Sequence, residues 1–176
     1  MNWLRWFKIK NIYVINGPNL NFLGIREITQ YGSTSFDELK NLVNSEAKKL
    51  KIKIDFFQSN VEGEIVNYIQ NLVNNENTWI VINPGAYTHT SIAIRDALQT
   101  YSQNNEIVEV HISDINQREE FRKINLISDI CNKSIIGRGV QGYIEALEYI
   151  NEQQSNNCLP RFIWLLFRGT FKKRIS

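Results

Sequence analysis

Five short runs of β-branched and aromatic residues recur along the chain, and longer segments with helical spacing follow them. The runs lie at residues 11–15, 52–57, 78–82, 107–110 and 134–136. Runs of this length and composition predict β-strands. In the four helical segments, apolar residues recur three or four positions apart, which predicts helices with one apolar face.

The apolar face of each predicted helix is expected to pack on a sheet. Ser35 with Glu38, and Ser59 with Glu62, have the spacing of a capping box, which predicts two helix N-termini. The four apolar stripes are, in chain order, Phe36, Leu39, Val43 and Leu50; Ile65, Ile69, Leu72 and Val73; Ile94, Ala97, Leu98 and Tyr101; and Val140, Tyr143, Ile144 and Leu147.

Strands that alternate with helices predict right-handed βαβ crossovers and a parallel sheet that is covered on both faces. The chain has 176 residues, 43% of them hydrophobic, which is enough for one domain with a sizeable core. Five strands in this length favour a flavodoxin-like, doubly wound α/β fold with strand order 2-1-3-4-5. Ligands of such folds bind beyond the carboxyl ends of the strands.

Charge divides the chain into a body and two basic extensions. Residues 1–11 and 152–176 contain eight of the 20 Lys and Arg residues and a single acid. Residues 12–151, the expected folded domain, have 12 basic and 17 acidic residues, a net charge of −5. This balance argues against a nucleic-acid-binding body. The role of the extensions cannot be predicted from their composition.

The two cysteines, Cys131 and Cys158, form no disulfide framework or metal-binding motif. The first residues lack the apolar core and cleavage site of a signal peptide. The apolar run at 162–167 is much shorter than the roughly 20 residues that span a membrane, although it has the composition to lie on a membrane surface or dock on the domain. We therefore expect a cytoplasmic protein without a membrane span.

Both histidines of the chain fall at the carboxyl end of a predicted strand. His89 follows the third strand by a few residues, and His111 comes directly after the fourth. One such histidine is more often structural, but two at the ligand-binding edge of the sheet favour an active site. The turn from Asn83 to Ala86 contains a glycine that permits close backbone approach, and exposed amides before the next helix attract anions.

The connection from Gly17 to Thr34 is much longer than the roughly two to six residues that usually join a strand to a helix. Long connections of this kind often form lids, and this one carries Arg26 and Tyr31. A nearby arginine lowers the pKa of a tyrosine from about 10 and favours the phenolate. A tyrosine base and a histidine acid suit removal of a proton beside a carbonyl, followed by loss of water.

Seven sequence blocks in this order resemble the type II 3-dehydroquinate dehydratases. The resemblance covers about residues 12 to 150 and leaves out both extensions. It implies cofactor-free dehydration of 3-dehydroquinate to 3-dehydroshikimate in the shikimate pathway, without a metal ion or a Schiff base, by trimers that assemble into a homododecamer. The blocks are NGPNLNFLG, YGS, QSNVEGE, NPGAYTHTSIAIRDAL, EVHIS, REEFR and GRGVQGY.

The resemblance implies roles for the residues that handle protons. Tyr31 would remove the proton from the carbon beside the ketone and give an enolate, while Arg26 keeps the phenol ionised. His111 would protonate the departing hydroxyl group, and Glu109 would orient His111. Asn19 would help to hold a water molecule against the enolate oxygen.

Other positions match the substrate-binding residues of the family. Ile112 and Ser113 would offer backbone amides to the substrate carboxylate, and Arg118 resembles a supporting arginine of the site. The resemblance also places Asp96 near a subunit interface. The matched substrate-binding side chains are Asn83, His89, Asp96 and Arg122.

The chain departs from the common family pattern at three positions. Ile28 stands where proline is common, which would leave the expected lid less stiff. Val61 replaces a frequent histidine at the start of a helix, with little expected cost. Asp114 replaces a frequent asparagine and adds negative charge near a site for an anionic substrate, which would weaken binding.

Two other functions fit the predicted fold. A flavin- or phosphate-binding module would use Ser33, Thr34 and Ser35 after the first strand to hold phosphate. A non-catalytic descendant of the enzyme would keep the scaffold and bind partners through its basic extensions.

Overall fold

The computed structural model describes residues 11–25 and 33–157 of the chain. Five strands form one sheet in which all neighbours pair in parallel, and their order is β2-β1-β3-β4-β5. This order confirms the predicted flavodoxin-like sheet. The strands are β1 (Asn11–Asn16), β2 (Ile54–Gln58), β3 (Thr78–Asn83), β4 (Glu106–His111) and β5 (Lys133–Ile136).

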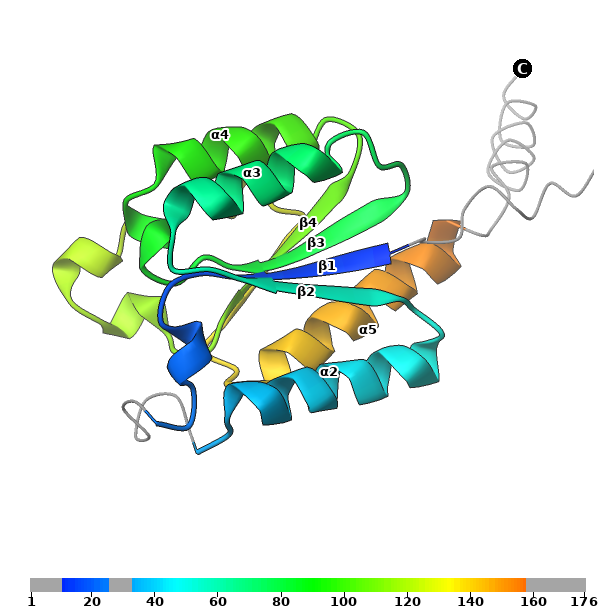
Figure 1. The fold of residues 1–176 in the computed structure, drawn as a ribbon, viewed down its shortest axis with the longest axis horizontal. Helices are drawn as coiled ribbons and strands as arrows, with labels where there is room; N and C mark the ends of the chain where they lie inside the picture. The colour runs from blue at the N-terminus through cyan, green and yellow to red at the C-terminus, as the bar shows by residue number, and fades with distance from the viewer. Residues whose placement is uncertain (1–10, 26–32, 158–176) are drawn as a thin grey trace, which may run out of the picture.

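Two helices cover each face of the sheet (Figure 1). Helices α2 (Phe36–Leu50) and α5 (Gln141–Asn157) lie on one face. Helices α3 (Glu62–Leu72) and α4 (Ile92–Tyr101) lie on the other. This two-sided cover is the doubly wound arrangement that the alternation of strands and helices predicts.

The predicted apolar stripes form two cores, one on each face of the sheet. Leu39, Val43 and Leu147 belong to the core under α2 and α5. Ile65 and Ile94 belong to the core under α3 and α4. Each fully buried side chain of this size contributes about 1.5–3 kcal/mol of transfer free energy. The two cores therefore hold the strands, and hence the strand ends, in fixed positions.

One of the two predicted capping boxes is present. The Ser35 hydroxyl accepts a hydrogen bond from the Glu38 amide, and Glu38 accepts one from the Ser35 amide. The second prediction is wrong, because α3 begins after Val61, which has no side chain that can cap it. Ser59 instead accepts a hydrogen bond from the Val61 amide and donates one to Glu64.

The expected extensions lie mostly outside the described residues. Asn11 begins β1 and residues 152–157 continue α5, so the expected boundary at residue 151 falls inside a helix. The division into a catalytic domain at 12–151 and two extensions stays a prediction. Within residues 11–25 and 33–157, no helix is both long enough and apolar enough to cross a membrane.

Candidate active site

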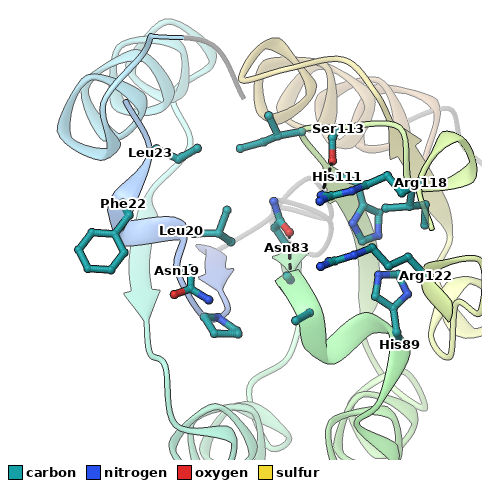
Figure 2. Close-up of a pocket in the computed structure, with 15 residues that line it drawn as sticks. Asn19, Leu20, Phe22, Leu23, Asn83, His89, His111, Ser113, Arg118 and Arg122 are labelled. Carbon is teal, nitrogen blue, oxygen red and sulfur yellow. Dashed lines mark hydrogen bonds between the residues drawn. The ribbon is translucent and has the colours of Figure 1, made fainter. Parts of the chain in front are cut away.

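A cavity of about 160 Å³ opens beyond the carboxyl ends of β1, β3 and β4. This is the edge of the sheet where the fold predicts a ligand site. Figure 2 shows Asn19 on one side of it and His89, His111 and the two arginines on the other, with Asn83 between them. The polar side chains that line it are Asn19, Asn83, His89, His111, Ser113, Arg118 and Arg122.

The floor of the cavity is built where β1 and β3 end side by side. The Gly17 amide donates to the Asn83 carbonyl over 2.8 Å. A Cβ atom at Gly17 would lie 2.1 Å from the Pro84 carbonyl oxygen, so only glycine permits this approach. Gly85 follows with φ of 60°, a conformation that other residues seldom adopt. The turn therefore brings β1 and β3 together as the sequence predicts.

Asn83 is buried in this floor, and hydrogen bonds fix its amide. Its Oδ1 accepts from the Gly85 amide over 3.1 Å, and its Nδ2 donates to the Tyr143 hydroxyl over 3.1 Å. The Tyr143 hydroxyl in turn donates to Asn16 over 2.6 Å. Burial raises the pKa of Tyr143, so the phenol stays protonated and keeps this donor. Asn83 therefore presents a preset donor and acceptor to the cavity.

His111 ends β4 and is almost completely buried, with 3% of its surface exposed. Its Nε2 lies 2.5 Å from Oε1 of Glu109, two residues earlier on the same strand. Burial raises the pKa of Glu109, but the hydrogen bonds and charge of His111, with hydrogen bonds from Ser134 and Asn125, outweigh it and hold that pKa below its usual value. The ionised carboxylate thus fixes the His111 ring through Nε2, which leaves Nδ1 for a ligand.

His89 is held differently, because its partner is a backbone carbonyl. Its Nδ1 lies 2.6 Å from the carbonyl oxygen of Ile124, so Nδ1 is the donor and Nε2 is left to accept from a ligand. Burial is the main cause that lowers the pKa of His89, and His111, Arg122 and Arg118 lower it further. His89 is therefore neutral near pH 7 and suited to hydrogen bonding with a hydroxyl group.

Two arginines give the cavity wall a positive charge. Arg122 forms an ion pair with Glu119 over 2.9 Å, and Arg118 lies 3.6 Å from the same carboxylate. Arg118 also donates to the Ser113 hydroxyl over 3.5 Å. The backbone amide of Glu119 and the two arginines hold the pKa of this carboxyl below its usual value. Two guanidinium groups line this wall and share a single carboxylate, so the wall keeps a net positive charge that suits an anionic ligand.

Asn19 lines the cavity on the β1 side. It has a left-handed backbone conformation with φ of 66°, and its backbone amide donates a hydrogen bond to Oδ1 of Asn60 over 2.9 Å. Gln58 donates to the same Asn60 oxygen and to the Gly17 carbonyl, each over 3.3 Å. These contacts with the end of β2 set the position of Asn19.

Among the described residues of the sequence-based site, Asp96 and Glu109 do not line this cavity, and Glu109 contacts it only through His111. Asp96 is exposed on α4 and does not line the cavity of its own chain, so its predicted substrate-binding role near a subunit interface stays a prediction. Tyr31 and Arg26 fall in residues 26–32, outside the described residues, and so does Ile28. Their roles stay predictions. Ile112 and Ser113 do line the cavity.

The departures at Val61 and Asp114 have local structural roles. Val61 is the N-cap residue of α3 and is 54% exposed. The Asp114 carboxylate accepts hydrogen bonds from the Asn116 amide over 2.9 Å and from the Gln117 side chain over 2.8 Å. It does not line the cavity, because these groups draw it into its own turn. The predicted weakening of anion binding stays a prediction.

Sequence reasoning missed four polar residues that support the site. Tyr143 was assigned only to the apolar face of a predicted helix. Asn60 precedes Val61, which was noted only because it departs from the common family pattern. Ser134 pairs with Glu109 in the register of β4 and β5, so aligning the two strands would have found it. No sequence signal points to Asn125, since its partner lies 16 residues away along an irregular connection.

The phosphate-binding alternative gains no support from the first connection. Ser35 is occupied as the cap of α2, with both its hydroxyl and its amide bonded to Glu38. A phosphate at this position would have to displace an acidic side chain. In the part of the chain that the structure describes, no group of three or more His, Cys, Asp and Glu side chains is arranged to hold a metal ion.

Known proteins resemble the chain over the region that builds this cavity. Residues 10–151 match the family model described as dehydroquinase class II. A Lachnoclostridium phytofermentans protein named 3-dehydroquinate dehydratase is 49% identical over 139 residues, which cover 79% of this chain and 94% of the relative. A Fusobacterium nucleatum protein of the same name is 50% identical over 143 residues, which cover 80% of this chain and 96% of the relative.

Solved structures agree with the sequence comparison. A type II dehydroquinase from Butyrivibrio crossotus is 50% identical, has a TM-score of 0.77, and covers 81% of this chain and 97% of its own. One from Propionibacterium acnes is 37% identical with the same TM-score, over 81% of this chain and 97% of its own. Every residue that lines the cavity lies within the matched region. The chain belongs to the type II dehydroquinase family.

Proposed function

We propose that this chain is a 3-dehydroquinate dehydratase, which removes water from 3-dehydroquinate to give 3-dehydroshikimate in the shikimate pathway. The observation that carries the proposal is the cavity in which His111, backed by Glu109, faces the same space as His89 and the two arginines. Relatives that are 49% and 50% identical over the region that builds this cavity are named 3-dehydroquinate dehydratase.

His111 is the proposed general acid. In this role His111 is an imidazolium whose Nε2–H donates a hydrogen bond to the ionised Glu109, and whose Nδ1 proton passes to the departing hydroxyl group. The hydroxyl leaves as water, and the enolate electrons form the new carbon–carbon double bond. Burial of both side chains excludes solvent that would compete for this proton.

The proposed base is Tyr31, with Arg26 favouring its phenolate. The phenolate takes the proton from the carbon beside the ketone, and the electron pair moves onto the carbonyl oxygen to give the enolate. Asn19, which lines the cavity, holds a water molecule against that oxygen. These three roles rest on the family resemblance.

The remaining groups of the cavity hold the substrate in this proposal. Arg122 and Arg118 attract its carboxylate, and the backbone amides of Ile112 and Ser113 bind it. His89 and Asn83 bind its hydroxyl groups, since His89 offers an acceptor and Asn83 a fixed amide. Base, acid and binding groups all come from the protein, so the proposal includes no cofactor and no metal ion.

We further infer a cytoplasmic homo-oligomer built from trimers, with a dodecamer as the complete assembly. Asp96 supports an assembly of this kind, because it is exposed on α4 and does not line the cavity of its own chain. It would reach substrate only from a neighbouring subunit. Light scattering after size-exclusion chromatography tests this, and a monomer with full activity would contradict it.

A direct assay tests the proposed activity. Purified full-length protein without added metal or cofactor is given 3-dehydroquinate, and the ultraviolet absorbance of the conjugated product is followed. We expect a rise in absorbance that scales with enzyme concentration. No rise at saturating substrate, from protein shown to be folded by circular dichroism, would contradict the proposal. A yellow protein with bound flavin would favour the alternative.

A further inference from the structure

Glu109 receives three hydrogen bonds, which come from three different parts of the fold. His111 and Asn125 both bond to Oε1, over 2.5 and 2.7 Å, and the Ser134 hydroxyl donates to Oε2 over 2.7 Å. The Glu109 side chain is completely buried. A carboxylate that accepts from three donors has its orientation fixed and needs no proton of its own.

Asn125 is itself held in place by the turn that follows it. Its Oδ1 accepts from the amides of Ile127, over 3.0 Å, and Ser128, over 3.1 Å. This leaves its Nδ2 pointing at Glu109, and the same amide cannot rotate without losing both backbone bonds. Asn125 is therefore oriented as a donor toward the carboxylate.

The segment that carries Asn125 also holds the other histidine. The preceding residue, Ile124, offers its carbonyl oxygen to His89. The next residue, Leu126, donates its amide to the Thr88 carbonyl over 3.0 Å. Three consecutive residues of one connection thus contact the support of His111 on one side and His89 on the other.

We propose that Asn125 and Ser134 are positioning residues for the dehydration. They hold Glu109 so that it accepts a hydrogen bond from Nε2–H of His111, which leaves Nδ1 of that ring facing the substrate. Neither side chain lines the cavity. They act through Glu109 and not on the substrate. This inference rests on the proposed function, since it assigns His111 the role of proton donor.

Asn125→Asp is the sharper of the two variants, because it keeps the acceptor for Ile127 and Ser128 and replaces the amide donor by a second carboxyl group. The new carboxyl would face Glu109, where two carboxylates cannot both be ionised at low cost. We expect kcat to fall about tenfold or more, with KM within about twofold, because substrate binding does not involve Asn125. Asn104→Asp, at an exposed turn after α4, serves as the matched control with unchanged kinetics.

Ser134→Ala removes the second donor and changes the shape of the strand little. We expect kcat to fall about threefold to tenfold, and Ser134→Thr, which keeps the hydroxyl, to restore most of it. Ser102→Ala is the matched control. The Ser102 hydroxyl is exposed and, among the described residues, bonds only the Gln99 carbonyl. Unchanged kcat in both Asn125→Asp and Ser134→Ala, or a rise in KM alone, would overturn the proposal.

A spectroscopic measurement separates this inference from the proposed activity. The chain has two histidines, so protein labelled with ¹⁵N on histidine gives two ring systems in solid-state spectra, and His89→Gln assigns them. In Ser134→Ala we expect the His111 ring signals to shift and the His89 signals to stay. Unchanged His111 signals would overturn the positioning role even if the protein dehydrates 3-dehydroquinate. Shifted signals without any dehydration would instead reject only the proposed function.

Discussion

The carboxyl ends of β3 and β4 each bring one histidine to the same cavity, but the two rings have different partners. His111 is almost fully buried and bonds a carboxylate that three donors hold. His89 is half-buried and bonds a backbone carbonyl beside two arginines. Burial and the nearby cations lower the pKa of His89 and keep that ring neutral, although the hydrogen bond to the Ile124 carbonyl acts in the opposite direction. His111 instead has a carboxylate that accepts a hydrogen bond from its Nε2–H. The surroundings of each ring, and not the residue type or its place in the fold, therefore distinguish the proposed proton donor from the proposed binding residue.

The largest expected effect is at the end of β4. His111→Ala should lower kcat by about a hundredfold or more, as expected when a general acid is removed. Its fold should remain, and circular dichroism and urea unfolding check this. Near-normal turnover would show that His111 does not supply the proton.

At the end of β3, loss of the ring should act on binding. His89→Ala removes a neutral hydrogen bond to substrate, so KM should rise about tenfold, the equivalent of about 1.4 kcal/mol. We expect kcat to stay within about threefold. Steady-state kinetics beside wild-type protein give both values. A large fall in kcat at unchanged KM would remove the distinction between the two histidines.

The two regions should also lose stability in different pH ranges. The folded-state pKa of His89 lies below its usual value near 6.5, so the unfolded chain binds a proton first. The contribution of His89 to the free energy of unfolding is fully present above about pH 6.5 and is lost as pH falls through its folded-state pKa. Glu109 also has a lowered folded-state pKa, so its contribution is present above its usual value of 4.5 and is lost below it.

Urea unfolding across pH separates these two contributions. His89→Gln should flatten the loss of unfolding free energy in the upper range, and Glu109→Gln in the lower range. A pKa that differs by one between the folded and the unfolded chain changes the free energy of unfolding by about 1.4 kcal/mol. An unchanged pH profile in either variant would contradict the corresponding assignment.

The smallest expected effect is at the C-terminal extension. The cavity is lined by residues between Pro18 and Arg122, and the described part of α5 reaches Asn157. Removing residues 158–176 should leave kcat and KM within about twofold, because the cut spares residues 141–157 of α5 and the described residues that line the cavity. A loss of activity or assembly would give the extension a role that its composition does not predict.

The sequence predicts the fold well because strand and helix periods depend on local apolar spacing. All five strands are found within two residues of their predicted ends, and the sheet order is as expected. The failed capping box at Ser59 has a local cause: α3 starts two residues later than the Ser59–Glu62 spacing requires, with Val61 as its N-cap. The spacing of a serine and a glutamate does not by itself determine which residue becomes the N-cap.

The site is only partly predictable. The two histidines could be found because strand ends in a parallel sheet meet at one edge. The family resemblance also gives Glu109 as the partner of His111. The Ile124 carbonyl that bonds His89 and the Asn125 amide that bonds Glu109 could not be found, since both residues belong to an irregular connection whose path depends on packing. Asp96 shows the opposite limit, because a residue that is exposed in its own chain acts on substrate only if a second chain brings it there.

Binding in the absence of turnover separates the two histidines most directly. Calorimetric titration with 3-dehydroquinate compares His111→Ala with the double variant His89→Ala/His111→Ala, neither of which should convert the substrate appreciably. We expect His111→Ala to bind 3-dehydroquinate, and the double variant to bind it about tenfold more weakly. Equal Kd values in the two variants, or no binding by His111→Ala, would contradict the assignment of binding to His89 and of proton transfer to His111.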